Sequence, residues 1–160
     1  MISEGLAAKF LATVMHAGQT DKAGRPYIEH VARVAYVVPE GEDVAVAWLH
    51  DVVEDASVKP VGLLEAGFSL ETVEAVIALT HAPGESHHEY IDRLCQNETA
   101  KRVKLADLAD NMDPSRALAA KLHDPEQVAR IDFLLTRYAE AKFRIENGRW
   151  SLLTDEVAGT

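Results

Sequence analysis

A group of ionisable residues lies in one of the most apolar segments of the sequence. Residues 45–56 (AVAWLHDVVEDA) contain His50, Asp51, Glu54 and Asp55. In a helix, residues four apart share a face, so His50 would lie over Glu54 and Asp51 over Asp55. Burying unpaired carboxylates is costly, and a divalent cation would offset that cost because imidazole and carboxylate groups both ligate metals. The segment therefore predicts a metal site with His50 and Asp51 as ligands; the alternative is a solvated acidic face.

Two other segments argue against a solvated acidic face. His30 follows a Pro-Tyr-Ile turn at the expected start of a helix, from which it can reach another helix. Asp107 and Asn111 are four residues apart in the mostly apolar stretch 103–112, so both would share a face and require polar partners. Lys104 precedes them and is a candidate contact for substrate phosphates, although a solvated basic turn explains it equally well.

The elements that must position these residues are all expected to be helices. Apolar residues recur with helical spacing, and no segment shows the two-residue alternation of a strand. The predicted helices cover about residues 3–17, 28–38, 43–55, 60–66, 69–81, 88–95, 99–112 and 125–147. The first is expected to bury Leu6, Ala7, Phe10, Leu11, Val14 and Met15, and the last Val128, Ile131, Leu134, Leu135 and Tyr138. We predict an all-α fold, with a turn over residues 18–27.

Length and charge exclude several classes of protein. The chain has 160 residues and a formal net charge of −10, which disfavours nucleic-acid backbones and anionic membranes as partners. Its one cysteine, Cys95, cannot form an intrachain disulfide, so we expect a reducing, cytoplasmic setting. No apolar run approaches the ~18 residues of a membrane span. One compact domain over residues 1–160 is expected, and nothing in the pattern indicates an oligomeric state.

Three motifs together resemble a known enzyme family. They are HxGQ…GxPYIxH at residues 16–30, WLHDVVEDA at 48–56 and VKLADLADNM at 103–112. In this order they resemble the HD phosphohydrolase superfamily, and within it the alarmone-hydrolase branch, which includes the hydrolase domain of RelA/SpoT proteins and small stand-alone hydrolases. The resemblance covers about residues 7–116 and implies a helical HD-domain fold, against which the helix at about 125–147 would pack.

The resemblance also implies an activity and roles for individual residues. The family removes diphosphate from the 3′ position of (p)ppGpp, a small-molecule nucleotide, and usually uses Mn²⁺; Fe²⁺ also suits such ligands. The implied metal ligands are His30, His50, Asp51 and Asp107. Glu54 and Asp55 match the acidic pair that positions and deprotonates the attacking water. Asn111 matches a residue that contacts the nucleotide near its ribose.

Several positions depart from the family pattern. Asp21 stands where the family usually has an arginine that packs on guanine, and Lys22 can replace that arginine only partly because it lacks a planar guanidinium. Leu108 and Asp110 stand where arginine and histidine are typical. Two alternatives therefore stay open. One is an HD phosphatase or phosphodiesterase that acts on a different nucleotide, and the other is a non-catalytic module that binds a metal or nucleotide.

Overall fold

The computed structural model describes residues 3–151, and that part of the chain is helical with no strand. This confirms the predicted all-α fold. The only pairing of strand type among these residues is an isolated bridge between Thr20 and Pro26. The helices are α1 (Glu4–Met15), α2 (Tyr27–Val37), α3 (Glu42–Leu49), α4 (Val52–Asp55), α5 (Pro60–Glu65), α6 (Leu70–Leu79), α7 (His87–Leu94), α8 (Glu98–Asn111), α9 (Pro114–His123), the 3₁₀ helix η1 (Pro125–Gln127) and α10 (Val128–Asn147).

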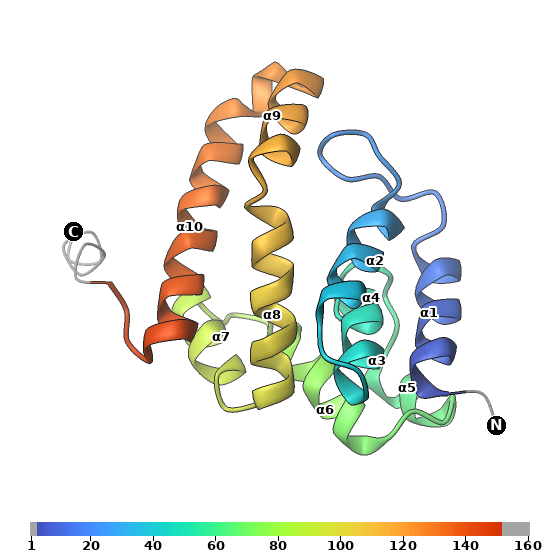
Figure 1. The fold of residues 1–160 in the computed structure, drawn as a ribbon. Coiled ribbons are helices and arrows are strands. Elements are labelled where there is room, and N and C mark those ends of the chain that lie inside the picture. Colours follow the sequence, from blue (N-terminus) through green and yellow to red (C-terminus); the bar gives the residue numbers. More distant parts are fainter. Residues whose placement is uncertain (1–2, 152–160) are drawn as a thin grey trace.

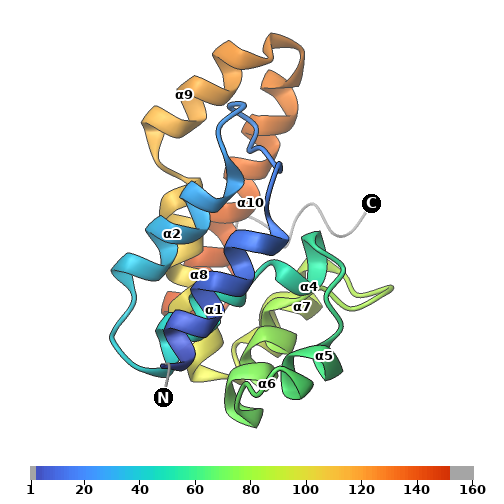
Figure 2. The same cartoon turned by 90° about the vertical axis from the view of Figure 1, so that its right-hand side faces the viewer.

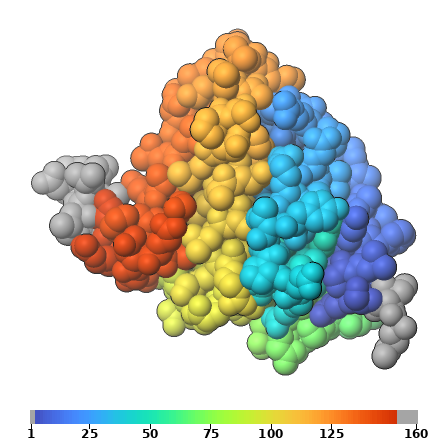
Figure 3. Space-filling view, in the orientation of Figure 1, coloured from blue at the N-terminus to red at the C-terminus, as the bar shows by residue number. Residues whose placement is uncertain are grey.

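The core forms around α3. This helix packs against α1, α2, α6 and α8, and residues 45–49 are almost completely buried. The long helices α8 and α10 pack against each other and lie to the left of α2 in Figure 1. Helix α9 lies beyond the end of α8. In the view turned by 90° the loop after α1 extends toward α9 (Figure 2), and in space-filling view α8 and α2 adjoin without a gap (Figure 3). No helix in residues 3–151 has the length and apolarity to cross a membrane.

The face that α1 buries differs from the predicted one. Leu6, Phe10 and Val14 are more than half exposed, whereas Ala8 and Ala12 are completely buried. Small residues let α1 approach α3 closely, and a Cβ added at Gly5 would lie 3.2 Å from a methyl group of Val44. Ala7 is exposed as well, so the predicted apolar stripe was wrong for four of its six residues. Close backbone contact selects small side chains here.

The predicted helix over residues 43–55 is interrupted where its chemistry lies. α3 ends at Leu49 and α4 begins at Val52, with Asp51 at φ −111°. The Ala47 carbonyl, which a continuous helix would pair with the amide of Asp51, accepts a hydrogen bond from Nδ1 of His50 at 2.7 Å. The prediction of one continuous helix was wrong, and the break lets His50 and Asp51 leave the helix repeat.

Helix α9 was not predicted from the sequence. Asp113 caps this helix, because its Oδ1 accepts from the amides of Ser115 and Arg116 at 2.9 and 3.1 Å, and Pro114 occupies the first turn. The same Asp-Pro signal at residues 124–125 correctly predicted the helical segment that starts there, η1 followed by α10. No element was predicted between Met112 and Asp124, whereas α9 lies there and places Arg116 beside α8.

Candidate metal centre and adjoining pocket

Three of the predicted metal ligands come together between three elements. His30 from α2, His50 at the end of α3 and Asp107 from α8 each offer a ligand atom, and these atoms all lie within 4.8 Å of one another. Nε2 of His30 is 3.3 Å from Oδ1 of Asp107, and Nε2 of His50 is 3.9 Å from the same oxygen. The side chains are only 2–7% exposed. This arrangement is a candidate divalent-metal site.

Asp51 approaches this group from the break between α3 and α4. Its Oδ2 lies 2.9 Å from Nε2 of His50 and accepts a hydrogen bond from the hydroxyl of Tyr27 at 2.5 Å. Its side chain is 22% exposed, more than those of the other three predicted ligands. Asp51 is therefore held beside the three-residue group on its solvent side. The sequence indicated Tyr27 only as part of the GxPYIxH motif. Its hydrogen bond to Asp51 gives a structural reason for a tyrosine at this position.

The state of His50 fits a metal ligand. Nδ1 donates to the Ala47 carbonyl, so Nε2 is the nitrogen that faces the carboxylates of Asp51 and Asp107 and can bind a proton or a metal. Burial opposes protonation of His50, but the charges of Asp51 and Asp107 outweigh it and raise its pKa to about 9. The site thus attracts positive charge, and a divalent cation could replace the proton on Nε2 and bind both this nitrogen and the carboxylates.

Two further residues contact the carboxylate of Asp107. Nζ of Lys104 lies 2.8 Å from Oδ2, and Nδ2 of Asn111 donates to Oδ1 at 2.6 Å. Burial raises the pKa of Asp107, but Lys104 and the two histidines lower it far below its usual range. The predicted substrate contacts Lys104 and Asn111 therefore both adjoin a candidate ligand, and Asp107 is ionised at any physiological pH.

Glu54 and Asp55 are both exposed and lie in α4, directly after Asp51 in the sequence. Oε2 of Glu54 accepts from the amide of His81 at 3.1 Å, which fixes the carboxylate over the loop after α6. The backbone carbonyl of Asp55 accepts from Gln19, whose Oε1 lies 2.9 Å from Nδ1 of His16. Partial desolvation and the neighbouring charges of Asp51 and Glu54 raise the pKa of Asp55. A carboxylate with a raised pKa is suited to accepting a proton from water.

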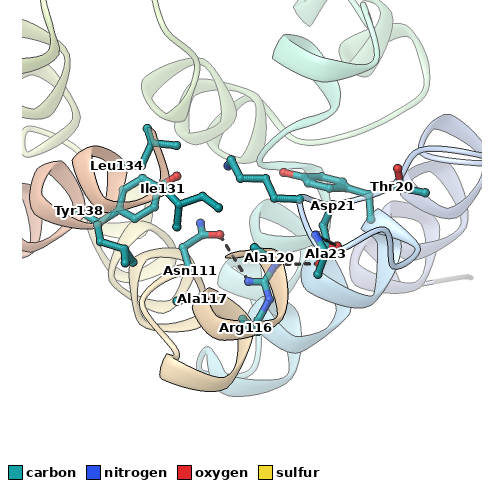
Figure 4. A pocket seen from close by; sticks show the side chains of 13 residues that line it. Thr20, Asp21, Ala23, Asn111, Arg116, Ala117, Ala120, Ile131, Leu134 and Tyr138 are labelled. Carbon is teal, nitrogen blue, oxygen red and sulfur yellow. Dashed lines mark hydrogen bonds and ion pairs between the residues drawn. The ribbon is translucent and has the colours of Figure 1, made fainter. Parts of the chain in front are cut away.

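A pocket of about 240 Å³ adjoins the centre. Asn111 and Lys22 line it, as predicted substrate contacts should, whereas Lys104 is not among its lining residues. Its other walls come from the loop after α1 and from α9 and α10 (Figure 4). Four of the five α10 residues that were expected in the core line this pocket, and Val128 does not: Ile131, Leu134, Leu135 and Tyr138. An apolar wall opposite polar groups suits a nucleoside.

The residues that depart from the family pattern take different places. Leu108 is buried in the core, only 1% exposed. Asp110 contacts the candidate ligand His30, with Oδ2 2.6 Å from Nδ1. Asp21 lines the pocket and forms an ion pair with Arg116 of α9 at 3.2 Å. Arg116 was not predicted as a site residue, because no sequence signal links residues 21 and 116.

The chain is similar in sequence to several longer proteins whose names refer to (p)ppGpp. The chain is 33% identical over 119 residues, 66% of its length, to the bifunctional (p)ppGpp synthase/hydrolase SpoT of Escherichia coli (strain K12). It is 33% identical over 132 residues, 73% of its length, to a probable guanosine-3′,5′-bis(diphosphate) 3′-pyrophosphohydrolase of Synechocystis. The matched region spans 17% of each of these longer proteins. No protein-family model matches the chain.

A solved structure shares the fold. It is that of a metazoan ortholog of SpoT, a protein that hydrolyzes ppGpp and plays a role in starvation responses. The match has a TM-score of 0.62 at 21% identity and covers 92% of this chain and 97% of the other. Because the match extends over nearly all of both chains, the helical arrangement seen here is that of the neighbour as a whole.

Proposed function

We propose that this chain, a member of the alarmone-hydrolase branch of the HD phosphohydrolases, is a metal-dependent nucleotide hydrolase that removes diphosphate from the 3′ position of (p)ppGpp. The observation that carries the proposal is the convergence of His30, His50 and Asp107 beside a pocket of nucleoside size. Relatives that share two thirds of the chain are named for this activity, but they are much longer proteins.

The proposed metal is Mn²⁺, with Fe²⁺ as the alternative. His30, His50 and Asp107 would hold the ion, with Asp51 adjoining. Imidazole and carboxylate ligands without a thiolate suit these ions better than a structural zinc. A bound divalent ion would lower the pKa of water and polarise a phosphoryl oxygen.

Glu54 and Asp55 are the proposed proton acceptors for the attacking water. The water oxygen forms a bond to the phosphorus attached to the 3′ oxygen, and the bond from that phosphorus to the 3′ oxygen breaks. Diphosphate leaves with the new oxygen, and the 3′ oxygen takes up a proton. Lys104 beside Asp107 adds positive charge at the reacting end, which favours an anionic substrate in an acidic protein.

The pocket is the proposed site for the nucleoside. Its apolar wall, which includes Leu134 and Tyr138, offers a surface for the base, and Asn111 lies where it can reach both the ribose and Asp107. Lys22 is exposed at the pocket edge and is available to phosphates. We propose that residues 1–160 act as one domain; the cytoplasmic location stays a prediction.

The test is an assay of diphosphate release. Chelator-treated protein is incubated with ppGpp and MnCl₂, FeCl₂, MgCl₂ or ZnCl₂, and the products are separated by anion-exchange chromatography. We expect GDP and diphosphate with Mn²⁺, and no product in Asp107→Asn protein. Absence of product from metal-loaded, folded wild-type protein would contradict the proposed substrate.

A second candidate is hydrolysis of a different nucleotide. It is favoured by Asp21, whose carboxylate is engaged by Arg116 at the position where the family has a guanine-stacking arginine. A panel of nucleotides with 3′, 5′ and cyclic phosphates separates the two candidates by their kcat/KM values. Binding of ppGpp without turnover of any member of the panel would instead indicate a non-catalytic module.

A further inference from the structure

The two acidic departures from the family pattern are joined by one side chain. Asp110 lies on α8 and Asp21 in the loop after α1, 89 residues apart in the sequence. Arg116 of α9 contacts both: Nη1 pairs with Oδ2 of Asp110, and Nη2 lies 3.2 Å from Oδ2 of Asp21. Nη1 also donates to the Asp110 carbonyl at 3.1 Å. The planar, five-donor guanidinium can serve two carboxylates at once, which an ammonium cannot do with the same geometry.

The Asp110 end of this bridge bears on the metal centre. Oδ2 of Asp110 lies 2.6 Å from Nδ1 of His30, while Nε2 of His30 faces Asp107. A carboxylate on one ring nitrogen makes that nitrogen the donor and leaves the other one free to ligate. Arg33 also binds Asp110, with Nε 2.6 Å from Oδ1. Asp110 is thus held from two sides in the position that orients His30.

The Asp21 end bears on the pocket. Oδ1 of Asp21 accepts from the amides of Ala23 and Arg25 at 2.9 and 3.0 Å, so the carboxylate shapes the loop that carries Lys22. The same loop rests on α9 at Gly24, where an added Cβ would lie 2.7 Å from the ring of His123. Both oxygens of Asp21 are therefore engaged within the protein.

The bridge is largely shielded from water. Arg116 is 17% exposed, Asp110 13% and Asp21 8%. Ion pairs that are removed from solvent and supported by further hydrogen bonds hold their geometry better than exposed ones, and loss of one partner leaves the other charge unpaired. Figure 4 shows Arg116 between Asn111 and the Asp21 loop at the pocket wall.

We infer that Arg116 is a positioning residue that couples the two halves of the site, holding His30 in its metal-binding orientation through Asp110 and holding the pocket loop through Asp21. The role of Arg116 toward His30 depends only on the candidate metal centre. Its effect on the KM for ppGpp rests on the proposed function. The arrangement also accounts for the acidic residue at position 21, which supplies the anchor for a guanidinium that comes from α9.

The test measures each half separately in Arg116→Gln protein. Titration of chelator-treated protein with MnCl₂ by isothermal calorimetry is expected to show a dissociation constant raised about 10–100-fold, as for other residues that orient a metal ligand. Amide hydrogen exchange at Ala23 and Arg25 is expected to be faster than in wild type. In the ppGpp assay the KM is expected to rise together with the loss of metal affinity.

Variants that remove only one of the two carboxylates bound by Arg116 separate its two roles. Asp110→Asn is expected to weaken Mn²⁺ binding while amide exchange in the loop stays as in wild type. Asp21→Asn is expected to speed exchange in the loop and raise the KM, with Mn²⁺ affinity unchanged. Arg116→Lys, which keeps the charge but not the fork, is expected to restore only part of the metal affinity.

A matched control removes a similar pair elsewhere. Arg102 of α8 binds Asp43 with Nε 2.5 Å and Nη2 2.7 Å from its two oxygens, at the other end of α3 from His50. Arg102→Gln is expected to lower the melting temperature and to leave Mn²⁺ affinity and loop exchange as in wild type. If folded Arg116→Gln protein binds Mn²⁺ and exchanges its loop amides like wild type, the inference is overturned. If neither wild type nor any variant hydrolyses ppGpp, but Mn²⁺ affinity and loop amide exchange change as expected, the proposed substrate is wrong and the coupling by Arg116 is supported.

Discussion

Two groups of histidines in this molecule have opposite surroundings. His30 and His50 face carboxylates, and the charges of Asp51 and Asp107 raise the pKa of His50 to about 9 despite its burial. At the start of α7, by contrast, burial and the positive charges of Arg137 and Lys104 lower the pKa of His87 to about 4. In both groups an imidazole Nε2 is buried, that of His50 or that of His87. Neighbouring charge, rather than the histidine itself, separates a cation site from a group that stays neutral.

The second group is built on aromatic contacts. His81 stacks on Tyr90 with ring centroids 4.3 Å apart, and His88 lies 3.9 Å from the ring of Trp150. The ring of His81 lies 4.0 Å from the carboxylate of Glu85, which Arg93 already binds at 2.7 Å, while Glu54 accepts from the backbone amide of His81. In the described part of the chain, the three-residue group of potential metal ligands is therefore the one around Asp107. A histidine cluster without a free carboxylate does not provide a charge-balanced site for a divalent ion.

The largest expected effect contrasts the two groups directly. His50→Ala removes a candidate ligand and is expected to abolish measurable Mn²⁺ binding and to lower kcat/KM by more than about 100-fold, since changes around a ligand alone cost about 10–100-fold. The matched variant His87→Ala, which removes the buried nitrogen of the other group, is expected to bind Mn²⁺ like wild type. Calorimetry and the diphosphate assay measure both quantities. Equal losses in the two variants would contradict the contrast.

The next effect separates proton transfer from metal binding. Glu54→Gln keeps a side-chain oxygen that can accept from the amide of His81, so the loop contact can persist while the basic group is lost. Mn²⁺ affinity is expected to stay within the range of wild type, and kcat to fall about 10²–10⁴-fold, the usual contribution of a general base. Turnover near the wild-type rate would show that Glu54 has no part in the reaction.

The sequence predicted the chemistry of the first group better than the path of the chain through it. Residue types and spacing indicated His50 as a ligand, the family resemblance added His30 and Asp107, and the structure brings these three together. The same spacing predicted a continuous helix through residue 50, and this failed because the side chain of His50 competes for the Ala47 carbonyl. Hydrogen bonds from a side chain to its own helix are not visible in periodicity.

Long-range charge pairs were the least predictable feature. Asp21 and Asp110 stood out only as departures from a pattern, and their link through Arg116 depends on a helix that the sequence pattern did not predict. In α1 the burial of Ala8 and Ala12 in place of larger side chains likewise depends on how closely α3 approaches. The ion pairs of Arg116 and the buried face of α1 both depend on which helices come into contact. Local sequence patterns do not encode those contacts.

The smallest effect concerns the stability of the second group. Because the pKa of His87 is lowered to about 4 from an ordinary value of 6.5, the unfolded chain takes up a proton at this residue over that pH range while the folded protein does not. The group therefore supports folding above about pH 6.5, and this contribution is lost as the pH falls toward 4. Burial and the positive charges of Arg137 and Lys104 disfavour the charged form of His87.

Replacing His87 by a side chain that does not titrate removes this pH dependence. In His87→Gln protein the melting temperature should fall less steeply between pH 6.5 and 4.5 than in wild type, as followed by circular dichroism. His87→Asn, a second replacement that does not titrate, should show the same shallower slope. An unchanged slope in His87→Gln would show that His87 is protonated in the folded protein and that the two histidine groups do not differ as described.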